Sequence, residues 1–209
     1  DEICAWTGSD LDTRIEQAVQ AAFRAQERNA DAVLRRLLQL EKTRVQMLLR
    51  GVVALDCSRD FDQIHAVEQK LALSIGGINL RLRLDRIDVN AAAESLILDY
   101  KTGTLRALLD RDKNPRDLQL LVYASAMRAP VGGIGLLNID SRSIALDAFG
   151  RAELPGADWD ARLAEWQDAV ARTAAQMATG DVRVGRWQTA KSARSLGLLS
   201  RYQELLREQ

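Results

Sequence analysis

The chain has 209 residues, of which 47% are hydrophobic and 28% charged, so it is long enough to bury one substantial core. Basic and acidic residues number 29 each, so the formal net charge is zero. This balance excludes a strongly basic surface over the whole protein, and any binding to nucleic acid must depend on local basic patches. The cysteines, Cys4 and Cys57, are too few for a disulfide framework or a cysteine metal cluster. We expect both to be reduced, as in a cytoplasmic protein, and we find no apolar run long enough to cross a membrane.

Residues 9 to about 55 carry apolar side chains at the three- and four-residue spacing of helices. A break in this pattern falls where Asn29 or Asp31 can cap a second helix. We therefore expect an N-terminal helical segment over residues 1–60, packed on a core that residues 61–209 form.

After residue 60 the apolar side chains alternate with polar ones, which is typical of strands. Two such runs flank Gly76 and Gly77, a strong signal for a two-residue hairpin loop. A loop of this length places Glu68 directly opposite Asp85, and two carboxylates paired on one face repel each other. Either Arg83, diagonal to Glu68, or a metal cation must neutralise them.

Residues 95–102 form a predicted third strand, on which Asp99 and Lys101 share one face. Asn114 as cap and Pro115 as first residue then predict a helix that ends near Arg128. Further strands at 134–139 and 143–149 and further helices at 159–179 and 190–207 complete the predicted elements. The order of elements indicates a mixed α/β (α+β) fold around a central sheet.

Three motifs follow one another along the chain: LDRID at residues 84–88, LDYKTG at 98–103 and QLxxYA at 119–124. In this order and spacing they resemble the PD-(D/E)XK nuclease superfamily, and within it the RecB/AddB-type nuclease domain of DNA repair and recombination exonucleases. The resemblance implies a restriction-endonuclease-like fold, in which helices flank a central mixed sheet. It also implies a metal-dependent DNA nuclease, by type an exonuclease, that acts in repair or recombination.

By the same resemblance the catalytic residues are Asp85, Asp99, Lys101, Gln119 and Tyr123. The two aspartates and the main-chain carbonyl of Tyr100 would hold Mg²⁺ or Mn²⁺, because hard cations prefer oxygen ligands. Glu68 is a further candidate ligand. Lys101 would orient or deprotonate the attacking water, and Gln119 and Tyr123 would position the substrate or that water. Asp88 lies on the opposite face of its strand from Asp85, so we interpret it as a supporting residue.

DNA is the implied substrate, with a helicase region of the same longer chain or a partner subunit as an expected partner. Residues 101–116 carry five bases against two acids, and residues 183–207 carry six against one. Either segment can contact phosphates, although a solvated helix face explains each equally well. The candidate substrate-binding residues are Arg86, Thr102, Arg106, Lys113 and Arg116.

Two departures from the family pattern bear on activity. Related enzymes often supply a metal-binding histidine from an early helix, but the single histidine, His65, stands at the entrance to a strand, and we expect it at the surface. The chain starts at Asp1, so a helix that carries the ligand could precede it in a longer protein. No cysteine occurs in residues 187–207, so we expect no iron–sulfur cluster.

Two alternatives stay open at this point. A catalytically inactive DNA-binding or interaction module with the same fold would also lack the histidine. An unrelated α/β domain would use Asp99 and Lys101 as an ordinary ion pair, and Asp85 would then lie far from Asp99.

Overall fold

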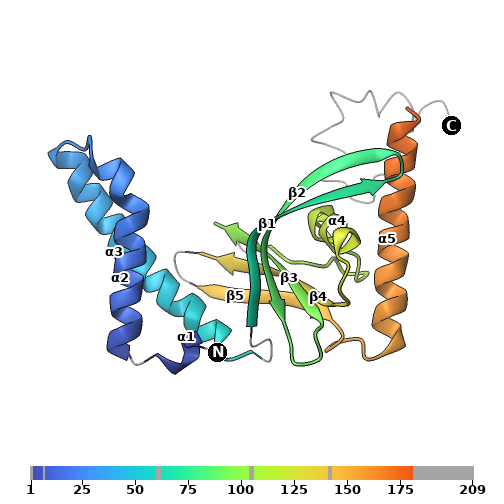
Figure 1. Ribbon diagram of the computed structural model, residues 1–209, viewed down its shortest axis with the longest axis horizontal. Helices are drawn as coiled ribbons and strands as arrows, with labels where there is room; N and C mark the ends of the chain where they lie inside the picture. Colours follow the sequence, from blue (N-terminus) through green and yellow to red (C-terminus); the bar gives the residue numbers. More distant parts are fainter. Residues whose placement is uncertain (1, 7, 60–62, 104–105, 141–142, 181–209) are drawn as a thin grey trace.

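The computed structural model describes residues 2–6, 8–59, 63–103, 106–140 and 143–180 (Figure 1). The helix predicted over residues 190–207 and the second basic segment, residues 183–207, lie outside these ranges. Within the described part of the chain, no helix is both long and apolar enough to cross a membrane.

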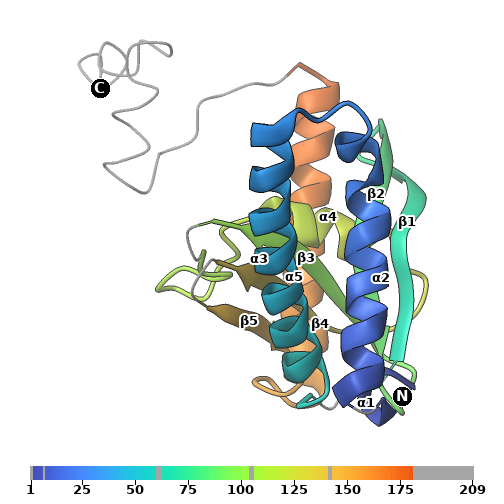
Figure 2. The ribbon, with the colours of Figure 1, turned by 90° about the vertical axis from the view of Figure 1, so that its left-hand side faces the viewer.

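Helices α1 (Glu2–Ala5), α2 (Gly8–Glu27) and α3 (Ala32–Asp56) precede the sheet, and α2 and α3 lie side by side (Figure 2). Asp31 is the N-cap of α3, where its side chain accepts the main-chain N–H of Leu34 at 2.8 Å, as one of the two predicted caps. The buried Lys42 joins the two helices through Glu27, 2.5 Å away. α3 also packs on the sheet. Gly51 lies so close to Ile144 that a Cβ at this position would meet the end of the isoleucine side chain.

The sheet has the strand order β1 (Gln63–Ile75), β2 (Ile78–Val89), β3 (Ser95–Thr102), β4 (Val131–Ile139) and β5 (Ile144–Gly150). β3 and β4 are parallel and the other neighbours are antiparallel. A parallel pair needs a crossover connection, and α4 (Leu118–Ala126) lies in it. With α5 (Ala157–Ala178) beside α4, the expected mixed sheet flanked by helices is confirmed (Figure 1).

The β1–β2 hairpin has the predicted register, with Ile75 paired to Ile78 and Leu71 to Leu82. Gly76 and Gly77 both have positive φ, as a two-residue hairpin turn requires. A side chain at Gly76 would meet the backbone of α5, so glycine also lets the tip of the hairpin contact that helix.

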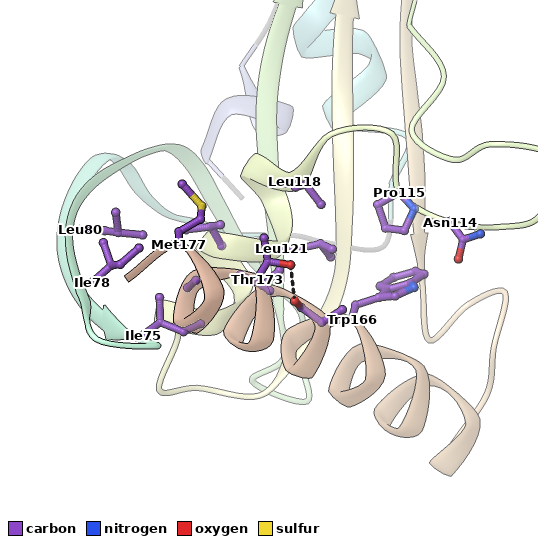
Figure 3. A pocket seen from close by; sticks show the side chains of 14 residues that line it. Ile75, Ile78, Leu80, Asn114, Pro115, Leu118, Leu121, Trp166, Thr173 and Met177 are labelled. Carbon is purple, nitrogen blue, oxygen red and sulfur yellow. Dashed lines mark hydrogen bonds between the residues drawn. The ribbon is translucent and has the colours of Figure 1, made fainter. Parts of the chain in front are cut away.

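The core lies between the sheet and helices α4 and α5. Phe149, Trp159 and Trp166 pack with ring centres 6.0–6.1 Å apart, and the Trp159 indole donates to the carbonyl of Val131 at 2.6 Å. Beside this cluster an apolar groove of about 420 Å³ opens between the hairpin, α4 and α5, with Leu80 and Met177 on its walls (Figure 3).

Two expectations about local structure are wrong. The helix expected to start at Asn114 and Pro115 starts at Leu118, with Asp117 as its N-cap. The cause lies upstream, because the Asp110 carboxylate accepts the main-chain N–H of Asn114 at 2.9 Å and closes a turn there. The helix ends at Ala126, before Arg128, since Met127 already has an extended backbone.

The second correction concerns the cysteines. Cys4 and Cys57 form a disulfide, with an S–S distance of 2.12 Å and a Cα–Cα distance of 5.5 Å, and are not reduced. Cys57 is the residue that caps the C-terminus of α3, and Cys4 belongs to α1. The bond therefore ties α1 to the C-terminal end of α3.

Candidate active site

The site forms where the pairing of β2 with β3 ends. Arg86 opposite Leu98 is the last pair of that ladder, and the next residues along the two strands are Asp85 and Asp99. Instead of continuing the ladder, the Asp85 carboxylate accepts the main-chain N–H of Tyr100 at 3.1 Å. Asp85 is near enough to Asp99 for its negative charge to contribute to the raised pKa of Asp99. The alternative in which these two aspartates lie far apart is therefore wrong.

Asp99 is 3% exposed, and its two oxygens have different surroundings. Oδ1 accepts a hydrogen bond from the side-chain amide of Gln119 at 2.9 Å. Oδ2 is fully buried, receives no hydrogen bond of regular geometry from the described residues, and has Lys101 Nζ 2.6 Å away as an ion-pair partner. Burial raises the pKa of Asp99; Lys101 opposes that rise, and the charges of Asp85 and Asp117 add to it.

The ammonium group of Lys101 has three polar neighbours, two as ion pairs and one by a hydrogen bond. It lies 2.6 Å from Asp99, 3.1 Å from Asp117 Oδ2 and 3.3 Å from the side-chain oxygen of Gln119. Burial by itself lowers the pKa of Lys101, but the ion pairs with Asp99 and Asp117 outweigh it, so the pKa is raised. Lys101 is thus a protonated, well-fixed cation at the end of β3.

Helix α4 and its N-cap supply the remaining groups. Gln119 donates through its amide nitrogen to Asp99 and also to the hydroxyl of Tyr123 at 2.6 Å. Asp117 accepts the main-chain N–H of Gln119 at 2.9 Å and so fixes the start of the helix. Burial favours the neutral acid, but the bond from Gln119 and the charge of Lys101 outweigh it, and the pKa of Asp117 is lowered.

Asp117 is the site residue that the sequence analysis missed. An aspartate two positions before Gln119 is a usual helix cap, but Asn114 and Pro115 offered a stronger helix start in the sequence. The structure brings the five predicted catalytic residues together with Asp117. Three of them, Asp85, Gln119 and Tyr123, line a pocket of about 450 Å³.

The donor set suits a hard divalent cation. Asp85 uses one carboxylate oxygen for the N–H of Tyr100, and Asp99 has the buried Oδ2 without a regular hydrogen bond. The described residues contain no cluster of three or more acidic, histidine or cysteine side chains suited to a metal. Two carboxylates still fit Mg²⁺, which proteins commonly hold with one or two carboxylates while substrate phosphates and water complete the shell.

Glu68 does not join this cluster. It has a φ of 52°, which few residues other than glycine adopt, and its exposed carboxylate pairs with Arg83 at 2.9 Å. Of the two alternatives for neutralising Glu68, the structure thus shows the arginine. His65 is exposed near the start of β1, as expected.

Arg86, a predicted DNA contact, is 3% exposed and does not present its charge to the surface. Its guanidinium binds both oxygens of the fully buried Asp88, at 2.6 and 2.9 Å, and also binds Asp56 of α3 at 2.7 Å. Arg59 joins the same buried network through Asp56 and Asp88. Asp88 therefore supports the fold, as its place on the opposite strand face indicates, and the network holds α3 against β2.

The other predicted substrate-binding residues, Thr102, Arg106, Lys113 and Arg116, are exposed. The main-chain N–H of Arg106 donates to Asn138 at 3.0 Å, and the side chain of Arg116 donates to the carbonyl of Leu109 at 3.2 Å. These contacts fix the loop between β3 and α4 and leave its basic groups at the surface.

Comparison with known proteins gives one family match. A family model described as the PD-(D/E)XK nuclease superfamily matches residues 4–189. No curated protein matches the chain.

Solved structures with some similarity to this chain include the following two. The structure of SSO0001 is 21% identical over 76% of this chain and 70% of its own, with a TM-score of 0.29. A protein from Eubacterium rectale with a provisional exonuclease name is 9% identical over 92% of this chain and 77% of its own, with a TM-score of 0.41. At these scores neither structure adds to the functional argument, which rests on the family match and the site.

Proposed function

Because the chain belongs to the PD-(D/E)XK nuclease superfamily, we propose that it is a metal-dependent deoxyribonuclease whose active site is the cluster around Asp85, Asp99 and Lys101. The observation that carries this proposal is the meeting of two carboxylates and an ammonium group at one strand end, beside an open pocket. These groups suit phosphodiester hydrolysis, which requires an activated water and neutralisation of charge on the phosphate.

Asp85, Asp99 and the carbonyl of Tyr100 hold Mg²⁺ or Mn²⁺ in this proposal. The cation supplies a water of lowered pKa and screens the negative charge of the phosphate. Lys101 has Asp117 and Gln119 as partners besides Asp99, so its ammonium group stays fixed when Asp99 takes another partner. From that position Lys101 stabilises the negative charge that develops at the phosphate, and Gln119 and Tyr123 position the water or the substrate.

We further propose that the enzyme is a RecB/AddB-type exonuclease of DNA repair or recombination, with a helicase region or a partner subunit that delivers DNA to it. The motifs LDRID, LDYKTG and QLxxYA support this finer assignment. A cytoplasmic location is part of the proposal. The Cys4–Cys57 disulfide weighs against this location, because disulfides are rare in reducing compartments. Thiol titration of freshly isolated protein tests it: free Cys4 and Cys57 thiols would support a cytoplasmic protein, and a bonded pair would contradict it.

One observation favours an inactive DNA-binding module with the same fold as the second candidate. Among the described residues no group of three or more acidic, histidine or cysteine side chains is arranged to hold a metal ion, so the cation would have few protein ligands. Such a module binds DNA and leaves it uncut.

The deciding experiment is degradation of end-labelled DNA in Mg²⁺ or Mn²⁺, compared with the same reaction in chelator. We expect metal-dependent loss of label in the wild type and a drop of roughly 100-fold or more in Asp99→Ala and in Lys101→Ala, the size typical for removal of a group that stabilises the transition state. Equal degradation by wild type and folded variants would show that this cluster is not the active site.

A further inference from the structure

We propose that Arg81 and Arg83 of β2 form a phosphate-binding track that leads DNA to Asp85. This inference rests on the proposed function for its substrate, and it concerns residues that neither the motifs nor the basic segments of the chain indicate. The occupant is the sugar–phosphate backbone next to the bond that is cut.

Strand geometry places these arginines beside the active site. Side chains two positions apart on a strand point to the same face, so Arg81, Arg83 and Asp85 form one row along β2. Successive members of the row are about 6.6 Å apart, from the rise of roughly 3.3 Å per residue. The row ends in the pocket that Gln119 and Tyr123 of α4 also line. A backbone that follows the row therefore reaches the carboxylates directly.

The positive charges of Arg81 and Arg83 are available to an anion. Among the described residues, none forms a hydrogen bond or an ion pair with the exposed side chain of Arg81. Arg83 pairs with Glu68, but the two side chains are 65% and 59% exposed, and surface pairs of this kind contribute little stability. A phosphate can replace Glu68, since arginine binds phosphate through paired, charge-assisted hydrogen bonds.

The partner strand adds to the same positive region. Lys70 of β1 lies directly opposite Arg83 in the register and is exposed. Like charges opposite each other destabilise a strand pair. The acid that offsets them, Glu68, has the unfavourable φ of 52°, a kind of strain that tends to occur at functional sites. A bound phosphate would relieve the repulsion between Lys70 and Arg83.

The opposite face of the hairpin has a different role. Ile75, Ile78 and Leu80 line the apolar groove against α4 and α5 (Figure 3). The hairpin thus has a packing face and a basic face, and only the basic face continues to Asp85.

The test measures DNA binding and its salt dependence for the wild type, Arg81→Gln, Arg83→Gln and the double variant. Fluorescence anisotropy of a labelled single strand and of its duplex is recorded without divalent metal over about 50 to 200 mM salt. Removal of one arginine that binds a phosphate should lower the magnitude of the slope of log K against log salt by roughly 0.7 on the single strand or 0.9 on the duplex. In the cleavage assay the same variants should raise KM several-fold and leave kcat within about twofold.

Arg36→Gln is the matched control, because it removes one exposed arginine near the start of α3, whereas α3 contacts β2 near its other end, through Asp56. The start of α3 lies apart from β2 and α4 (Figure 1). We expect wild-type slope and KM for this variant. Arg36, Arg81 and Arg83 are all exposed, so thermal unfolding of every variant should match the wild type and verify the fold.

Two outcomes overturn different claims. Unchanged binding and slope in the double variant, or an equal loss in Arg36→Gln, would overturn the phosphate track whether or not the protein cuts DNA. If the wild type cuts no DNA but the arginine variants show the expected changes in salt slope, the nuclease proposal is overturned and the phosphate track stays in place.

Discussion

Asp117 and Lys101 form an ion pair of 3.1 Å between the start of α4 and the end of β3. The second oxygen of the same carboxylate accepts the main-chain N–H of Gln119. One side chain therefore fixes both a charged group from the strand and an amide-bearing residue from the helix.

Replacing Asp117 by asparagine separates these two tasks. Asparagine caps helices as well as aspartate does, so the helix should keep its start while Lys101 loses a charged partner. We expect kcat to fall roughly 10- to 100-fold, the usual cost of losing a residue that orients an active group, with Tm within a few degrees of the wild type. Steady-state kinetics and a thermal melt measure both effects.

Asp31→Asn is the control, because Asp31 makes the same kind of cap at α3 and is exposed away from the site. Its kcat should equal that of the wild type. If Asp117→Asn also keeps the wild-type kcat, Asp117 acts as a helix cap alone.

Stability should depend on pH through Asp117. Because the pKa of Asp117 is lowered in the folded protein, its ionised form contributes stability above the unfolded pKa of about 3.9. That contribution is lost as pH falls through the lower folded pKa. The Tm difference between wild type and Asp117→Asn should therefore be largest near neutral pH and vanish at the acid end. A difference that stays constant across the range would contradict the ion pair.

The buried network gives a stability prediction of its own. Removing Arg86 by substitution with methionine leaves the fully buried Asp88 without its bidentate partner, and breaking buried pairs in this way costs about 3–5 kcal/mol. Urea unfolding should show a loss of this size. The double variant Arg86→Met with Asp88→Leu should recover much of it, because the uncompensated carboxylate is gone; a double variant that is less stable than Arg86→Met would contradict this explanation.

The sequence predicted β3 with the bounds that the structure shows, because an apolar run leads into alternating polar and apolar residues and a Thr-Gly pair ends it. The two glycines likewise determined the hairpin register. These signals are local, so no knowledge of distant residues was needed. The relation of Asp85 to Asp99 followed from motif order and strand pairing together.

The sequence patterns did not predict contacts between residues that are far apart in the chain. In the sequence Arg86 looks like an exposed strand arginine. Only the fold brings Asp56 of α3, thirty positions earlier in the chain, into contact with it. The disulfide depends in the same way on α1 lying against the end of α3. Asp117 was missed because Asn114 and Pro115 favour a helix start in the sequence, whereas in the structure the Asp110 carboxylate accepts the main-chain N–H of Asn114 and closes a turn there. The positive φ of Glu68 has no signature in its neighbours.

The central claim is that Asp85 and Asp99 together hold one divalent cation, and calorimetric titration of the protein with Mn²⁺ tests it most directly. We predict one site in the wild type, affinity reduced roughly tenfold or more in Asp85→Asn and in Asp99→Asn, and unchanged binding in the control Glu68→Gln. Titration that reveals no site in the wild type, or equal affinity in all four proteins, would contradict the account.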